Sequence, residues 1–261
     1  MSTAADRWRA ELEAWTIPDE ILAAALESPY GFPAGMFTAE ADPADTPSHR
    51  RAREVLPMGG TVLDVGCGGG GAAMALVPTA GLVTGVDSAP HMVEAFAAAA
   101  DARGVAHREV LGSWPDVAVE AGKADIVVAH HVTYNVADLV PFALALDNAA
   151  RRRVVVEMTD VHPWVPTNDL WLRFHNLPRP AGPSARLCAE VLTAAGLDVR
   201  SQRWQRPARR TDRAGTVSFI RRRLCLPVGA EPEVDAALPA DYQFQLRAVT
   251  TLWWEPTPRR S

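Results

Sequence analysis

The chain has 261 residues, of which 48% are hydrophobic and 22% are charged, and its formal net charge is −5. This composition is typical of globular domains and excludes disordered, collagen-like and coiled-coil chains. Three widely separated cysteines provide neither a disulfide framework nor a zinc cluster, and no apolar run reaches the roughly 18 residues of a membrane span. The N-terminus lacks the pattern of a secretion signal. We therefore expect a cytoplasmic protein with free thiols, no membrane contact and no nucleic-acid partner.

Helical patterns fill the first part of the chain. They predict helices over 7–15, 18–26 and 48–56, with a stretch rich in Pro and Gly between the last two. We interpret residues 1–56 as a helical N-terminal cover. Aromatic side chains of the Pro-rich stretch, among them Tyr30, Phe32 and Phe37, are expected to help it close over a site as a lid.

From Gly60 onward, short runs rich in Val and Ile alternate with longer Ala-rich helical stretches. This alternation predicts parallel strands joined by crossover helices, in a doubly wound α/β domain over 57–261. The expected strands are 61–65, 82–86, 106–111, 125–129 and 153–158, and the expected helices are 70–76, 90–103, 115–121, 137–150 and 183–195. Strands at 197–206 and 246–254 follow, separated by a helical insertion at about 211–240 with helices over 215–226 and 231–238.

The strongest motif is a strand that runs directly into the glycine cluster 66–71 and then into a helix. Glycines permit positive φ and let a ligand approach the backbone, while a helix start presents unpaired N–H groups. Asp87 ends the next strand, where its carboxylate faces the same crevice and can accept hydrogen bonds from ribose hydroxyls. The glycine cluster and Asp87 together predict a ligand that contains a nucleoside. The alternative is a tight turn, with Asp87 only capping the helix that follows.

Two ligand classes fit the glycines. Gly66, Gly68 and Gly71 satisfy the G-x-G-x-x-G pattern of nicotinamide and flavin sites. However, the motifs D-V-G-C-G-G-G, V-T-G-V-D and A-D-I-V-V-A followed by H-H-V-T-Y-N resemble those of class I S-adenosylmethionine-dependent methyltransferases, over roughly residues 45–160. Asp64 fits that family better than it fits the dinucleotide pattern. The resemblance implies a mostly parallel seven-stranded sheet with an antiparallel last strand, and S-adenosylmethionine as cofactor.

The resemblance also implies a set of cofactor contacts. Gly66 and Gly68 would lie along the amino acid end of the cofactor, Asp64 near its ammonium, Asp87 at the ribose and Met92 beneath the adenine or sugar. Trp114 is expected either to stack on the adenine or to anchor the core. The full set of expected cofactor contacts is Asp64, Gly66, Cys67, Gly68, Asp87, Ser88, Met92, Gly112, Ser113, Trp114, Ala129 and His130.

Methyl transfer is expected beyond the carboxyl end of the fourth strand. His130 and His131 follow that strand, and imidazole suits proton transfer near neutral pH, so both are candidate general bases, with Tyr134 as a further catalytic or orienting residue. Alternatively, one histidine packs at the cofactor and the other in the core. Aromatic residues after the fifth strand, among them Trp164 and Trp171, are expected to form a substrate wall or a helical core stripe.

Taken together, these features favour a metal-independent methyltransferase that acts on a small molecule at oxygen or nitrogen. No metal is expected, because a histidine stands where catechol-type enzymes carry a carboxylate. Arginine groups at 151–153, at 209–210 with Arg206, and at 221–223 are expected to be solvated helix ends and faces and not phosphate sites. Of the neighbouring Trp253 and Trp254, one is expected to be buried and the other to mark a lid or subunit contact. The alternatives are a nicotinamide-dependent oxidoreductase and a non-catalytic cofactor-binding protein.

Overall fold

A computed structural model describes residues 2–30, 45–206, 212–242 and 245–256. Its centre is a seven-stranded sheet with the strand order β3-β2-β1-β4-β5-β7-β6. The strands are β1 (Gly60–Val65), β2 (Ala80–Asp87), β3 (Ala106–Leu111), β4 (Ala124–His130), β5 (Ala150–Thr159), β6 (Arg200–Arg206) and β7 (Arg247–Trp254).

The direction of the strands follows from their sequence. The four pairings among β1 to β5 are all parallel. β1, β2, β4 and β5 each contain an apolar run buried on both faces, whereas the edge strand β3 is mostly exposed. The late strand β7 inserts antiparallel between β5 and β6. The predicted doubly wound sheet with an antiparallel last strand is therefore confirmed.

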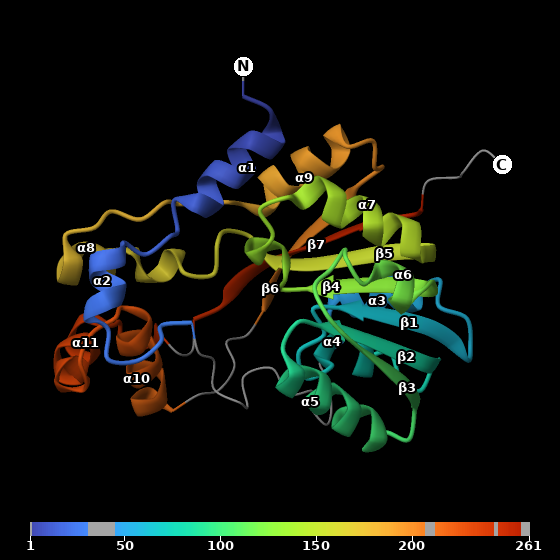
Figure 1. Cartoon of the computed structure of the whole chain (residues 1–261), viewed down its shortest axis with the longest axis horizontal. Coiled ribbons are helices and arrows are strands. Elements are labelled where there is room, and N and C mark those ends of the chain that lie inside the picture. Colours follow the sequence, from blue (N-terminus) through green and yellow to red (C-terminus); the bar gives the residue numbers. More distant parts are fainter. Residues whose placement is uncertain (1, 31–44, 207–211, 243–244, 257–261) are drawn as a thin grey trace.

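Two helical layers cover the sheet (Figure 1). On one face, α1 (Ala4–Glu13), α6 (Ala118–Ala121), α7 (Leu139–Ala149) and α9 (Ala185–Ala194) contribute to one hydrophobic cluster. On the other face lie α3 (Pro47–Arg53), α4 (Gly71–Met74) and α5 (Pro90–Asp101). Helices thus cover both faces of the central strands, as parallel strands require.

A third hydrophobic cluster lies beyond the sheet. It joins α2 (Asp19–Ala24), α8 (Asn168–His175), α10 (Arg213–Arg223) and α11 (Glu231–Ala237). Figure 1 shows these four helices grouped on one side of the molecule. The predicted insertion, α10 and α11, therefore packs with α2 and α8 around a core that is separate from the two faces of the sheet. We call this group the helical cluster.

The three N-terminal helices do not form one layer. The fully buried Trp8 places α1 in the core of the main sheet, and α3 packs against β5 and β7. The third helix, α2, belongs to the helical cluster. Most of the Pro-rich stretch expected to act as a lid, including Phe32 and Phe37, lies outside the described residues.

The prediction for the two tryptophans of β7 is wrong in part. Trp253 and Trp254 do point to opposite faces, but both are buried, at 7% and 0% exposure. The reason is that helices cover both faces at this position. Trp254 donates a hydrogen bond to Asp147 on α7, and Arg51 of α3 lies over the Trp253 ring.

The three cysteines are free and buried. None of the described helices is long and apolar enough to cross a membrane.

Candidate active site

The glycine loop leaves β1 next to the point where the sheet order reverses, between β1 and β4. The backbones of Gly66, Gly68 and Gly70 have φ of 68°, 49° and 81°, a region that favours glycine. The N–H groups of Gly66 and Cys67 both donate to the carbonyl of Val86 on β2. The loop is therefore held against the end of the neighbouring strand, in the crevice where open α/β sheets bind ligands.

Asp87 links the loop to the end of β2. One carboxylate oxygen accepts from the N–H of Gly68 and the other from the N–H of Ala89, both at 3.0 Å. The side chain is partly exposed, and each oxygen retains a second lone pair. The geometry therefore fits a carboxylate that organises the loop and can still accept the two hydroxyls of a ribose.

Asp64 lies beneath the loop. Its side chain is 1% exposed, and one oxygen accepts from the N–H of Ala73 on α4 at 3.1 Å. Burial raises the pKa of Asp64 to about 8, which the hydrogen bond from Ala73 opposes only in part. The expected contact with the cofactor ammonium stays a prediction that this buried position does not support. The neighbouring Cys67 is also buried, and burial raises the pKa of its thiol.

The loop after β3 carries Trp114, which was expected either to stack on the adenine or to anchor the core. Trp114 donates through its indole nitrogen to the carbonyl of Phe142 at 3.2 Å and packs against the main core. This favours the core anchor over stacking on adenine. Gly112 donates to the backbone of Asp87, which holds this loop beside β2. Ser88 and Ser113 are exposed near the same edge, and Met92 is half-buried on α5, so their cofactor contacts remain predictions.

His130, the last residue of β4, and His131, which follows it, have different surroundings. The Nε2 atom of His130 is buried with no hydrogen-bond partner among the described residues, and its ring stacks near that of His49 on α3. Burial lowers the pKa of His130 to about 3, so its ring is neutral at neutral pH. A general-base role for His130 does not fit, because its ring is enclosed and holds a proton poorly. The preceding Ala129 is fully buried in the main core.

His131 has an unusual backbone. Its φ of 60° is rare for a residue with a side chain, and its N–H donates to the carbonyl of Glu157 on β5 at 2.7 Å. Such conformations persist only where surrounding contacts enforce them, and they gather at functional sites.

Both ring nitrogens of His131 have partners. Nδ1 lies 2.5 Å from the hydroxyl of Tyr134, which also accepts from the N–H of Thr159 at 3.3 Å. Nε2 lies 2.7 Å from Nη1 of Arg206 on β6 and 3.0 Å from Oε1 of Glu157. The structure therefore brings His131 and Tyr134 together as expected, and adds two charged residues that the sequence analysis did not select.

These charged residues differ in exposure. The Glu157 side chain is 4% exposed and that of Arg206 is 38% exposed. Burial opposes the ionisation of Glu157, but its interactions with His130 and His131 outweigh burial and lower its pKa. Burial raises the pKa of Tyr134, so the phenol stays protonated at neutral pH. One signal was available: Glu157 is an acidic residue within the apolar half of β5, between Val156 and Met158. Arg206 carried no comparable signal.

The expected substrate wall is divided. Trp171 and Phe174 pack into the helical cluster, and His175 bonds to the carbonyl of Leu224 there. His162 remains near the site, since its ring meets that of Tyr134 edge-on at 6.0 Å and stacks on Trp15 at 4.0 Å. The helical stripe thus belongs to the core of the helical cluster, as the alternative interpretation stated.

Comparisons with known proteins agree with this geometry. Residues 62–153, from β1 into β5, match the family model of a methyltransferase domain. The chain resembles the YcgJ protein of Bacillus subtilis at 21% identity and a TM-score of 0.55, covering 81% of this chain and 99% of that one. It also resembles a putative methyltransferase from Bacillus halodurans at 14% identity and a TM-score of 0.54, covering 81% and 97%.

A third similar structure is a putative sarcosine dimethylglycine methyltransferase from Galdieria sulphuraria, at 16% identity and a TM-score of 0.52, covering 79% of this chain and 82% of that one. At such identities the likeness establishes the fold and not the acceptor. No curated protein matches the sequence significantly. Residues 62–153 therefore match a methyltransferase domain, and the strand order with its antiparallel β7 is that of the class I methyltransferase fold.

Proposed function

We propose that the protein transfers the methyl group of S-adenosylmethionine to an oxygen or nitrogen atom of a small organic acceptor, without a metal ion. The observation that carries this proposal is the contact between the glycine loop and the turn that bears His131. A Cβ atom built at Gly66 would lie 2.4 Å from a methyl group of Val132. The loop expected to hold the cofactor and the polar group formed by His131, Tyr134, Glu157 and Arg206 are therefore immediate neighbours.

The bound cofactor supplies a methyl group on a positively charged sulfur. The chain's own residues then have to orient the acceptor and exclude water, which supplies much of the acceleration of such a displacement. Glu157 of β5 lies beside the end of β4, but its buried Oε1 is 3.4 Å from Arg206 Nη1 and 3.0 Å from His131 Nε2. Because the guanidinium charge beside this oxygen opposes the binding of a cation, the arrangement supports independence from metal. Activity that persists in excess chelator is the expected result, and loss of activity that Mg²⁺ restores would contradict this part of the proposal.

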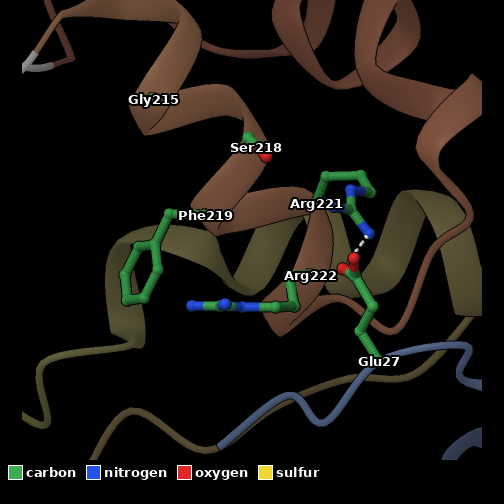
Figure 2. A pocket seen from close by; sticks show the side chains of 6 residues that line it. All are labelled: Glu27, Gly215, Ser218, Phe219, Arg221 and Arg222. Atoms are coloured by element: carbon green, nitrogen blue, oxygen red, sulfur yellow. Dashed lines mark hydrogen bonds and ion pairs between the residues drawn. The ribbon is translucent and has the colours of Figure 1, made fainter. Parts of the chain in front are cut away.

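A small acceptor is supported by the contacts of the arginine groups. Arg153 pairs with Glu54 and Glu255, and Arg221 pairs with Glu27. Figure 2 shows the Arg221–Glu27 pair in a pocket on α10. These charges are compensated within the chain and are not set out as a track for phosphates. Arg209 and Arg210 lie outside the described residues.

Calorimetric titration tests the cofactor part of the proposal. We expect S-adenosylmethionine and S-adenosylhomocysteine to bind with one site per chain, and NAD not to bind. Incubation with methyl-labelled cofactor and a panel of small phenols, carboxylic acids and amines, followed by mass spectrometry, tests the transfer. Tight cofactor binding without a methylated product from any acceptor would favour the non-catalytic alternative. Nicotinamide chemistry is disfavoured by the methyltransferase domain match and the antiparallel β7.

A further inference from the structure

The hydrogen bonds around His131 are incompatible with one another in a single protonation state. The Nε2 atom of a neutral imidazole carries either a hydrogen or a lone pair. It lies 2.7 Å from an arginine nitrogen, which can only donate, and 3.0 Å from a carboxylate oxygen, which can only accept. Nε2 can therefore bond to Arg206 or to Glu157, but not to both.

Each choice fixes the proton on the opposite side of the ring. If Arg206 donates to Nε2, the hydrogen of the neutral ring is on Nδ1, and it points to the Tyr134 oxygen at 2.5 Å. If Nε2 instead donates to Glu157, Nδ1 carries the lone pair and accepts the hydroxyl hydrogen of Tyr134.

The distances favour the first arrangement. Arg206 Nη1 is the closer partner of Nε2, and it also lies 3.4 Å from Oε1 of Glu157. Its two hydrogens can therefore serve the imidazole and the carboxylate together. The positive charge then offsets the repulsion between the lone pairs of Nε2 and Oε1, which lie 3.0 Å apart. Glu157 supports this position because it is buried, at 4% exposure, and a buried carboxylate needs an opposite charge such as that of Arg206 beside it.

We propose that Arg206 is a positioning residue that selects the Nδ1–H tautomer of His131 and so directs the Tyr134 hydroxyl hydrogen to the methyl acceptor. In this tautomer the Tyr134 oxygen accepts two hydrogen bonds, from His131 Nδ1 and from the N–H of Thr159. Both of its lone pairs are then used, and its own hydrogen is the one left for another acceptor.

This arrangement changes the role expected of His131. Both ring nitrogens are occupied, so His131 is a positioning residue and not a base while Arg206 is in place. The polar group formed by His131, Tyr134, Glu157 and Arg206 therefore offers the methyl acceptor a hydrogen-bond donor and no base. It therefore suits a nucleophile with a free lone pair before transfer, such as a carboxylate or an unprotonated amine. This last step rests on the proposed function, whereas the tautomer does not.

The experiment is a long-range ¹H–¹⁵N correlation spectrum of the full chain with ¹⁵N-labelled histidine, recorded without cofactor. His131→Gln assigns the resonances. We expect a protonated Nδ1 and an unprotonated Nε2 in the wild type, and the reverse in Arg206→Met, where Nε2 turns to Glu157. Arg206→Lys, which keeps a charged donor, should restore the wild-type pattern.

Arg203→Met is the matched control, because Arg203 lies on the same strand but pairs with Asp160, and its spectrum should equal that of the wild type. A wild-type spectrum with hydrogen on Nε2, or an unchanged tautomer in Arg206→Met, would overturn the proposal. The wild-type spectrum decides the tautomer even if Arg206→Met does not fold. Cofactor binding, measured separately, tests the proposed function, so the two can fail independently.

Discussion

Gly66 and Val132 are in contact across the crevice between β1 and β4. There is no room for a side chain at Gly66, since a Cβ would lie 2.4 Å from Val132 Cγ2, and its φ of 68° disfavours any other residue. This contact fixes the distance between the loop expected to hold the cofactor and the turn that carries His131. Glycine at this position therefore serves the geometry of the site as well as the turn.

The first prediction concerns this contact. Gly66→Ala should destabilise the fold by about 1–3 kcal/mol through strain and overpacking, and should abolish measurable cofactor binding. Gly71→Ala is the control, because no atom lies within 4 Å of a Cβ there, and it should leave the midpoint of urea unfolding unchanged or higher. Equal cofactor affinity in Gly66→Ala and wild type would contradict the central place given to the Gly66–Val132 contact.

Asp87 gives a second prediction. Asp87→Ala removes the acceptor for the N–H groups of Gly68 and Ala89 and the expected ribose contact. We expect cofactor affinity in calorimetry to fall by about 2–4 kcal/mol. Asp116→Ala, at an exposed residue in the loop after β3, is the control and should bind normally. An unchanged dissociation constant for Asp87→Ala would remove this residue from the site.

A third prediction follows from the buried Asp64. Its pKa in the folded chain is raised to about 8 from an ordinary value of 3.8, so the folded state binds more protons between these pH values. The group therefore stabilises the fold fully at low pH, and this contribution declines as pH rises towards 8. Asp64→Asn keeps an oxygen for the Ala73 N–H but cannot ionise. Urea unfolding measures the free energy of unfolding at pH 5 and at pH 8. This free energy should fall less between the two pH values in Asp64→Asn than in the wild type, by at least about 1 kcal/mol. Parallel pH profiles would show that Asp64 is ionised in the fold.

The fourth prediction tests whether α1 belongs to the main core. Trp8 is fully buried and donates to the carbonyl of Val136, so Trp8→Ala should cost about 3–5 kcal/mol in unfolding free energy. Leu26→Ala is the control, because Leu26 is 81% exposed and its loss should change stability little. A small effect of Trp8→Ala would indicate that α1 contributes little to the stability of the main core.

Most of the elements could be predicted from the sequence, because parallel strands are continuous apolar runs and the glycine loop marks the first crossover. Which helices pack against one another could not be predicted. Nothing in the pattern of residues 18–26 says that α2 packs with α10 and α11 and not with α1. That choice depends on contacts between segments far apart in the chain.

The same limit applies to the site. Asp87 and His131 follow the ends of parallel strands, so a spacing argument finds them. Arg206 reaches His131 from β6, one of the two edge strands, and its position depends on the insertion of β7. Trp114 was ambiguous because an amphipathic ring fits a ligand or a core equally well, and only the hydrogen bond to Phe142 decides between them.

The place of β7 has a consequence for biosynthesis. β6 is joined to the rest of the sheet only through β7, although β7 is made some forty residues later. On the ribosome, β1 to β5 can assemble while β6 still has no strand to pair with. Arg206 therefore reaches His131 only after residues 247–254 have emerged and docked, so the polar group around the histidine is among the last parts of the nascent enzyme to mature.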